Sequence, residues 1–207
     1  MAPKTKISIG LLWLFTLSGI IGILSPAKDW FLMLTPLNLG LSFLIIAINL
    51  KGFSKFTAHA FAIPFLLGFL TEALGVNYGL LFGAYSYGAN LGFKIMGVPL
   101  IICINWCMLT IVTADLAKFM THNKWLRIGL GALIMTLLDV IIEVSAPRFD
   151  FWEFEGGIVP LQNYLAWFAI AGLAHLGYQS YAIDSHSKIS FHVLASIFVF
   201  FAVFLIF

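Results

Sequence analysis

Apolar residues fill seven stretches of this 207-residue chain almost without interruption, and polar residues gather between them. The stretches are residues 7–24, 30–50, 56–76, 95–114, 125–144, 160–178 and 189–207. A helix that crosses the hydrocarbon core of a bilayer needs about 20 predominantly apolar residues. The pattern therefore predicts an all-α integral membrane protein with about seven transmembrane helices in one bundle.

Most connections between the stretches are short, which predicts antiparallel neighbours within a single transmembrane domain over residues 1–207. Two connections are longer. Residues 77–94 are rich in Gly, Tyr and Asn, and residues 145–159 carry four charged side chains around Trp152. The basic start of the chain before Ile7 is typical of a signal peptide. However, the apolar run continues to Leu24, which favours a retained first helix.

The distribution of Lys and Arg predicts the orientation, because both residues stay preferentially on the cytoplasmic side. Of the 11 Lys and Arg residues, eight fall on the side of the N-terminus: Lys4, Lys6, Lys51, Lys55, Lys118, Lys124, Arg127 and Lys188. The other three are Lys28, Lys94 and Arg148. We therefore expect a multi-pass protein of the cell inner (cytoplasmic) membrane, with a cytoplasmic N-terminus, an outer C-terminus and both longer connections outside.

The composition excludes a soluble domain, because 61% of the residues are hydrophobic and only 10% are charged. A soluble protein normally carries about 25% charged residues. The net charge of +2 is too small and too scattered to indicate a nucleic-acid partner. Cys103 and Cys107 lie four residues apart in one apolar run, a spacing poorly suited to a disulfide. We interpret them as small core residues.

Three carboxylates lie inside the predicted spans, where charged residues are costly and mark functional sites by default. Glu72 lies near the outer end of the third span, and Asp139 and Glu143 lie in the outer half of the fifth. The spacing of the latter two puts both on one face of a helix, and the topology brings all three to a similar depth. Three acids in a low-dielectric pocket cannot all stay ionised. A protonated carboxylic acid among them could donate a proton to carbon.

A structural role is the alternative: the acids could pair with Lys94 or Arg148, or accept hydrogen bonds from Tyr and Asn. The convergence of three acids favours the functional interpretation. Side chains at a similar depth are candidates for binding substrate or water: Tyr85, Tyr87, Asn105, Trp106, Trp152, Gln162, Asn163 and Trp167. Asn and Gln also join helices in membrane bundles, and Tyr and Trp form interfacial belts, so both interpretations stay open.

The histidines predict no metal site. His59, His122 and His186 lie near the cytoplasmic ends of the spans, and His175 lies toward the same side. No HxxxH, HxxH or Cys/His cluster occurs, and metal ligands would have to come from one depth. We therefore expect neither a metal nor a cofactor. Asp115, near the inner end of the fourth span, is expected to pair with Lys118 or water.

Two long segments resemble the membrane-integral carotenoid biosynthesis family, whose known members are carotenoid 1,2-hydratases. They are TEALGVNYGLLFGAYSYGANLGFKIMGVPLIICINW (71–106) and LLDVIIEVSAPRFDFWEFEGGIVPLQNYLAWF (137–168). Many members read Asp-x-x-x-Asp-Pro where this chain has Asp139, Glu143 and Val144, and carry a second Trp where it has Phe154. Glu for Asp keeps the acid, whereas the missing Pro leaves the reach of Glu143 uncertain.

The resemblance implies addition of water to the C1=C2 double bond of a carotenoid ψ-end, with a carotenoid substrate, membrane lipid around the protein and no cofactor. Protonation of C2 would leave a tertiary cation at C1, which water captures and aromatic faces stabilise. Glu72, Asp139 and Glu143 are the candidate catalytic acids. Asp139 is our first choice of proton donor, because it lies about one turn deeper than Glu143 and should be the more desolvated.

Three rival functions are considered. A retinal protein needs a Lys in the middle of its last span, and residues 189–207 contain none. A small transporter should distribute its charges along a path across the membrane, whereas these acids gather at one depth. A non-catalytic protein that binds a carotenoid or another isoprenoid has the same sequence features as the enzyme. The sequence does not specify the carotenoid, the number of ends that react, or the oligomeric state.

Overall fold

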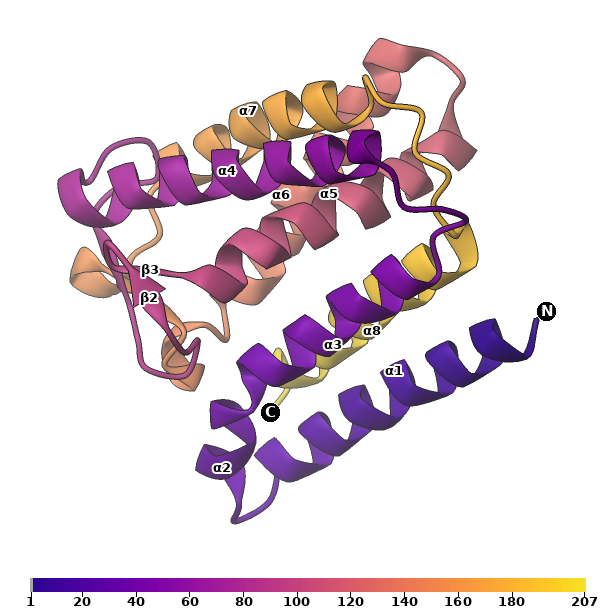
Figure 1. Cartoon of the computed structure of the whole chain (residues 1–207). Coiled ribbons are helices and arrows are strands. Elements are labelled where there is room, and N and C mark those ends of the chain that lie inside the picture. The colour runs from indigo at the N-terminus through magenta and orange to yellow at the C-terminus, as the bar shows by residue number, and fades with distance from the viewer. Residues whose placement is uncertain (1) are drawn as a thin grey trace.

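A computed structural model describes residues 2–207, which form eight α-helices packed in one bundle (Figure 1). The helices are α1 (Pro3–Ile23), α2 (Lys28–Met33), α3 (Thr35–Ile48), α4 (Lys55–Tyr78), α5 (Leu100–Met120), α6 (Lys124–Glu143), α7 (Leu161–Tyr178) and α8 (Ser187–Phe204). Successive long helices run antiparallel, as their short connections require. Helix α5 lies at the centre and contacts α3, α4, α6, α7 and α8.

The predicted all-α fold and multi-pass membrane character are confirmed. Of the eight helices in residues 2–207, five are long and apolar enough to cross a membrane: α1, α4, α5, α6 and α8. Helix α3 is apolar but has only 14 residues, and the more polar α7 is not among the five. Seven spans therefore remain a prediction.

Two of the predicted stretches differ from the helices. The stretch 30–50 is broken at Leu34 into α2 and α3. Pro36 falls in the first turn of α3, the position where a proline costs the helix no hydrogen bond. The stretch 95–114 becomes helical only at Leu100, because residues 94–99 form a hairpin of β2 (Lys94–Ile95) and β3 (Val98–Pro99). Its turn residues Met96 and Gly97 both have positive φ, 51° and 80°, as a two-residue hairpin loop with a type I′ turn requires.

The two longer connections join each other in a second antiparallel strand pair. Strand β1 (Tyr85–Tyr87) pairs with β4 (Trp152–Phe154), with Tyr85 opposite Phe154 and Tyr87 opposite Trp152. Successive side chains of a strand point to opposite faces. The four aromatic side chains therefore share one face, and the exposed Ser86 and Glu153 share the other. The 3-10 turns Pro147–Phe149 and Glu155–Gly157 flank β4.

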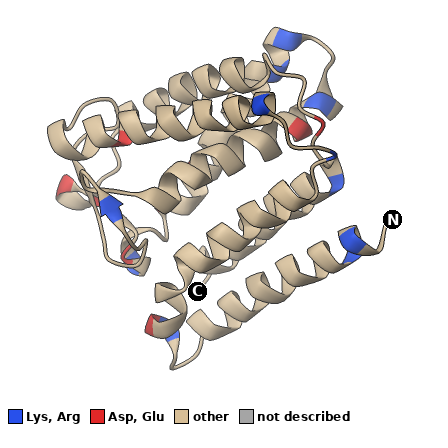
Figure 2. Ribbon diagram, viewed as in Figure 1, with Lys and Arg blue, Asp and Glu red and all other residues tan. Residues whose placement is uncertain are grey.

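The basic residues gather at one end of the bundle. Figure 2 shows most of the Lys and Arg positions at the end where α1, α4, α6 and α8 begin. The β1–β4 pair lies at the opposite end. The separation of charge used for the topology prediction is thus present in the fold, while the orientation in a membrane stays a prediction.

Candidate active site

The three intramembrane acids line one small cavity near the β1–β4 end of the bundle. Glu72 comes from α4, and Asp139 and Glu143 come from α6; their exposed fractions are 3%, 2% and 7%. The cavity, which we call the carboxylate pocket, offers about 30 Å³ to the centres of water molecules. One water needs roughly 10–15 Å³ of such space. The pocket therefore has room for about two waters beside the acids.

Glu72 accepts hydrogen bonds from three aromatic side chains. The Trp106 indole donates to Oε1 (2.9 Å), the Tyr87 hydroxyl donates to Oε2 (2.6 Å), and the Tyr85 hydroxyl donates to the same oxygen. Burial and the neighbouring Glu72 charge raise the pKa of both tyrosines. Both phenols therefore stay protonated and act as donors. Together the three donors stabilise and orient the carboxylate.

Two glycines of α4 make room for these donors. Gly68 and Gly75 flank Glu72 on its own helix face, at i−4 and i+3. A Cβ on Gly68 would lie 2.6 Å from the Trp106 ring, and a Cβ on Gly75 would lie 2.8 Å from the Tyr85 ring. Real Cβ contacts are longer, so both rings rest directly on the helix backbone. The local sequence GFLTEALG thus brings the donors to the acid.

Asp139 and Glu143 form a pair on α6 that is joined by one amide. The Asn163 side chain, from the first turn of α7, donates to Asp139 Oδ2 (3.0 Å) and to Glu143 Oε1 (3.3 Å). The Trp152 indole donates to the other Glu143 oxygen (2.9 Å). The four-residue spacing therefore does put both acids on one face, with a shared donor between them.

No cation neutralises the pocket within residues 2–207. Lys94 donates to the Tyr87 carbonyl oxygen (2.6 Å), and Arg148 donates to Ser145 (3.3 Å) and to the Phe204 carbonyl oxygen. The two ion pairs found within residues 2–207 lie away from the pocket, at Lys51–Asp184 and Lys118–Asp115. Isolated buried charges are very costly. Three adjacent carboxylates without a counter-ion must therefore retain at least one proton.

Aromatic rings form a large part of the wall of the carboxylate pocket. Trp106 and Trp167 stack with their ring centroids 4.3 Å apart and their planes at 13°. Phe82 packs against Trp167 at 6.3 Å, and the Phe154 ring lies 5.2 Å from that of Tyr85. Aromatic faces attract cations, most strongly when both are shielded from water. The pocket thus combines acids, hydrogen-bond donors and surfaces able to stabilise positive charge.

Most of the predicted binding residues do converge on the carboxylate pocket. Tyr85, Tyr87, Asn105, Trp152, Asn163 and Trp167 line it, and Trp106 lies behind Glu72 as a donor. Gln162 does not join them, because its side chain is exposed and lies outside the pocket. As the neighbour of buried Asn163, it points about 100° away around α7.

The apolar part of the wall of the carboxylate pocket was not predicted from the sequence. These residues are Phe82, Ile102, Leu109, Ile142 and Phe154. Ile102 and Leu109 lie three residues before and four after Asn105, on the same helix face. This spacing is readable from the sequence. The position of Phe82 is not, because it depends on the fold of the loop after α4.

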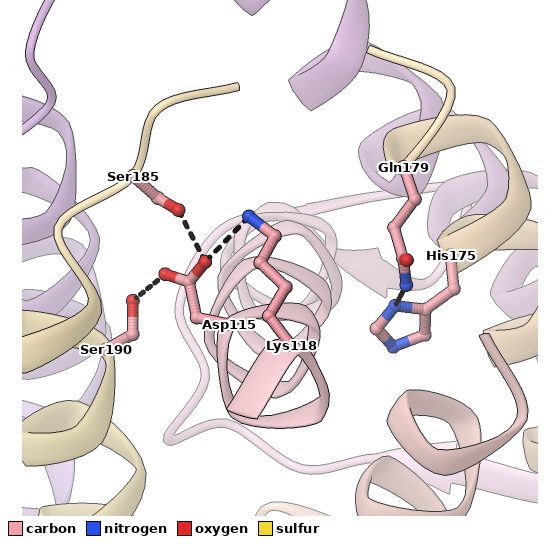
Figure 3. Close-up of polar contacts among 6 residues, drawn as sticks. All are labelled: Asp115, Lys118, His175, Gln179, Ser185 and Ser190. Atoms are coloured by element: carbon pink, nitrogen blue, oxygen red, sulfur yellow. Dashed lines mark hydrogen bonds and ion pairs between the residues drawn. The ribbon is translucent and has the colours of Figure 1, made fainter. Parts of the chain in front are cut away.

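A fourth buried carboxylate, that of Asp115, lies at the opposite end of the bundle, away from the pocket. Asp115 accepts hydrogen bonds from Ser185 (2.5 Å), Ser190 (2.5 Å) and Lys118 (3.1 Å), as Figure 3 shows. Its predicted pairing with Lys118 is therefore confirmed.

His175 lies near the same end and contacts Gln179 (3.2 Å; Figure 3) and Thr113 (3.1 Å). The described residues contain no group of three His, Cys, Asp or Glu side chains placed to hold a metal ion. The contacts of Asp115 and His175 tie helices together.

The fold and the site define a multi-pass helical membrane protein with a buried, aromatic-walled carboxylate pocket. Residues 32–207 match the family described as carotenoid biosynthesis protein, and the chain belongs to that family. Its role accordingly lies in carotenoid biosynthesis. No curated protein and no solved structure matches the chain. All residues of the carboxylate pocket fall within the matched range.

Proposed function

We propose that this protein is a carotenoid 1,2-hydratase, which adds water to the C1=C2 double bond of a carotenoid ψ-end and yields a tertiary alcohol. The observation that carries the proposal is the carboxylate pocket itself. Three acids without a counter-ion share a cavity of about 30 Å³ with aromatic walls. A ψ-end is an unactivated alkene, so its hydration needs a strong proton donor, a held water and stabilisation of a cation.

In the first step, the protonated Asp139 carboxyl transfers its proton to C2, and the π electrons of the double bond form the new C–H bond. C1 becomes a tertiary carbocation, and Asp139 becomes a carboxylate. Asp139 suits this role because it is buried and, among the described residues, accepts a side-chain hydrogen bond from Asn163 alone. Glu72, which accepts three hydrogen bonds, is suited to remain a carboxylate and to oppose the positive charge.

In the second step, water adds to C1 and loses a proton to a carboxylate, which completes the tertiary alcohol. Glu143 is the candidate acceptor, because Asn163 and Trp152 hold its two oxygens in place. Asn105 lines the same pocket. Its amide bonds to no other side chain in residues 2–207 and is free to hold the water. Glu143 then releases its proton to solvent and Asp139 takes one up from solvent, so the net change is the addition of one water and no co-reactant is consumed.

The proposal is tested by expression in a bacterial host that makes lycopene or γ-carotene. Pigment extracts should contain a product heavier than the substrate by one water, and cells with the Asp139→Asn protein should contain only substrate. A pigment that co-purifies with the wild-type protein but is never altered would instead support a binding protein. Activity that is lost on chelation and restored by one specific metal would contradict the metal-free mechanism.

A further inference from the structure

A second cavity adjoins the carboxylate pocket between α3, α5 and α8. This middle cavity offers about 90 Å³ to the centres of water molecules. Ile102, Asn105, Leu109, Ile142 and Trp152 line both spaces. These five side chains therefore lie between the carboxylate pocket and the middle cavity.

A third cavity continues from the middle cavity to the outer surface between α1 and α3. This portal cavity also offers about 90 Å³, and it shares Thr35, Asn38 and Phe200 with the middle cavity. Its wall includes Phe15 and Leu37, which are 38% and 55% exposed. Helices α1, α3 and α8 lie together on one side of the bundle (Figure 1). The series therefore leads sideways, toward lipid.

The middle cavity suits a hydrocarbon. Its wall is mostly aliphatic and aromatic. The hydroxyls of Thr16, Ser42 and Ser196 each donate to a carbonyl of their own helix, at 2.8, 2.9 and 2.8 Å. Their hydrogens are therefore already used, and these residues present little polarity to the cavity. Hydrocarbon placed there would break none of these three hydrogen bonds.

We propose that the three cavities form a lateral channel, which holds the long apolar chain of the substrate while its reacting end lies in the carboxylate pocket. The inference rests on the proposed function for its occupant, a linear polyene. The carboxylate pocket is too small for more than the end of the chain, so the remaining carbons lie in the channel. Because the portal opens toward lipid, the far end stays in the bilayer, and the two ends of a symmetrical carotenoid react one at a time.

The channel is tested by narrowing it at a distance from the acids. Ser42→Leu and Ser196→Leu each add two heavy atoms to the side chain that lines the middle cavity, one from α3 and one from α8. Each replaced hydroxyl bonds only to a carbonyl of its own helix. Neither substitution therefore leaves the side chain of another residue without its hydrogen-bond partner. Ala169→Leu adds comparable bulk on the outward face of α7, where Ala169 is exposed, and serves as the matched control.

Two substrates separate the channel from the chemistry: a full-length acyclic carotenoid and a short isoprenoid with the same terminal double bond. Both narrowing variants should lose about tenfold or more of their activity on the full-length substrate. They should keep activity on the short one, and Ala169→Leu should keep both. Unchanged full-length activity in both narrowing variants would overturn the channel. Failure of the wild-type protein to hydrate either substrate would overturn the proposed function instead.

Pigment binding gives a readout that does not need turnover. Asp139→Asn protein purified from lycopene-making cells should retain lycopene, and adding Ser196→Leu or Ser42→Leu should remove it. Melting of the purified proteins in detergent distinguishes lost binding from lost folding. Equal pigment content in correctly folded single and double variants would also contradict the channel, whether or not hydration occurs.

Discussion

The two ends of the bundle each bury carboxylates, but they satisfy them differently. At one end, Asp115 has one cation and two serine hydroxyls as partners and lines neither the carboxylate pocket nor the middle and portal cavities. At the other, Glu72, Asp139 and Glu143 have only neutral donors and surround a cavity. A buried acid is thus structural where its charge is matched and space is filled. It is suited to chemistry where a proton must be retained and a substrate can enter.

The largest expected contrast comes from the same substitution at the two ends. Asp139→Asn keeps size and hydrogen-bonding shape but removes the transferable proton. Proton transfer by a positioned acid accelerates a reaction by about 10²–10⁴-fold, so hydration should fall at least about 100-fold while the protein stays folded and inserted. Pigment conversion in membranes, normalised to protein, measures the loss.

Asp115→Asn should show the opposite profile. It leaves Lys118 without its carboxylate, and a hydrogen bond to a charged group contributes about 1.5–3 kcal/mol. The melting temperature in detergent should therefore fall, while hydration per folded molecule stays near the wild-type value. Near wild-type hydration by Asp139→Asn, or loss of hydration by folded Asp115→Asn, would erase the distinction between the two ends.

A smaller effect is expected within the carboxylate pocket. Glu143→Gln keeps the size of the side chain and one accepting oxygen for its two donors, but removes a carboxylate that takes up a proton from water. Because Glu72 or solvent can accept that proton, we expect a loss of about tenfold, at or below the lower end of general acid–base effects. Initial rates of product formation for the two variants test this order. A larger loss for Glu143→Gln than for Asp139→Asn would reverse the assigned roles.

The sequence revealed the acids of this pocket and most of its polar and aromatic neighbours, but not the strand pairing that brings them together. The spacing of Asp139 and Glu143 is local, so helical periodicity alone put them together. Strands β1 and β4 are three residues each and lie in separate connections, so their pairing, which brings Tyr85 and Trp152 to the site, has no local pattern. Gln162 and Asn163 are equally polar neighbours in the first turn of α7, and only the packing of that helix turns Asn163 inward and Gln162 outward. The break at Leu34 likewise depends on the packing of α2.

The glycines beside Glu72 give a subtler test. Gly75→Ala would put a Cβ within 2.8 Å of the Tyr85 ring, forcing the ring and its hydroxyl away from Glu72. Loss of one hydrogen bond of about 1 kcal/mol predicts about a fivefold fall in hydration. Gly172→Ala, on α7, is the matched control, because a Cβ there meets no atom within 4 Å among the described residues. Equal activity of the two variants would show that the Tyr85 contact is dispensable.

The membrane orientation should change no rate but decides which end faces which compartment. The excess of Lys and Arg at the Asp115 end predicts a cytoplasmic N-terminus and an outer C-terminus. A C-terminal alkaline phosphatase fusion should therefore be active and a C-terminal fluorescent reporter that folds only in the cytoplasm should be dark. The reverse result would put the carboxylate pocket in the inner leaflet. Fusions after α3 and after α7 test the two shorter or more polar spans.

Isotope labelling of the product tests the central claim, protonation of carbon by a solvent-exchanging acid followed by capture of water, most directly. Membranes containing the protein and lycopene are incubated in water enriched in oxygen-18, and separately in D2O. The account predicts one oxygen-18 atom in the product from labelled water, and one non-exchangeable deuterium at C2 from D2O. Asp139→Asn should incorporate neither. Oxygen derived from O2, or a hydroxylated product without deuterium at C2, would contradict it.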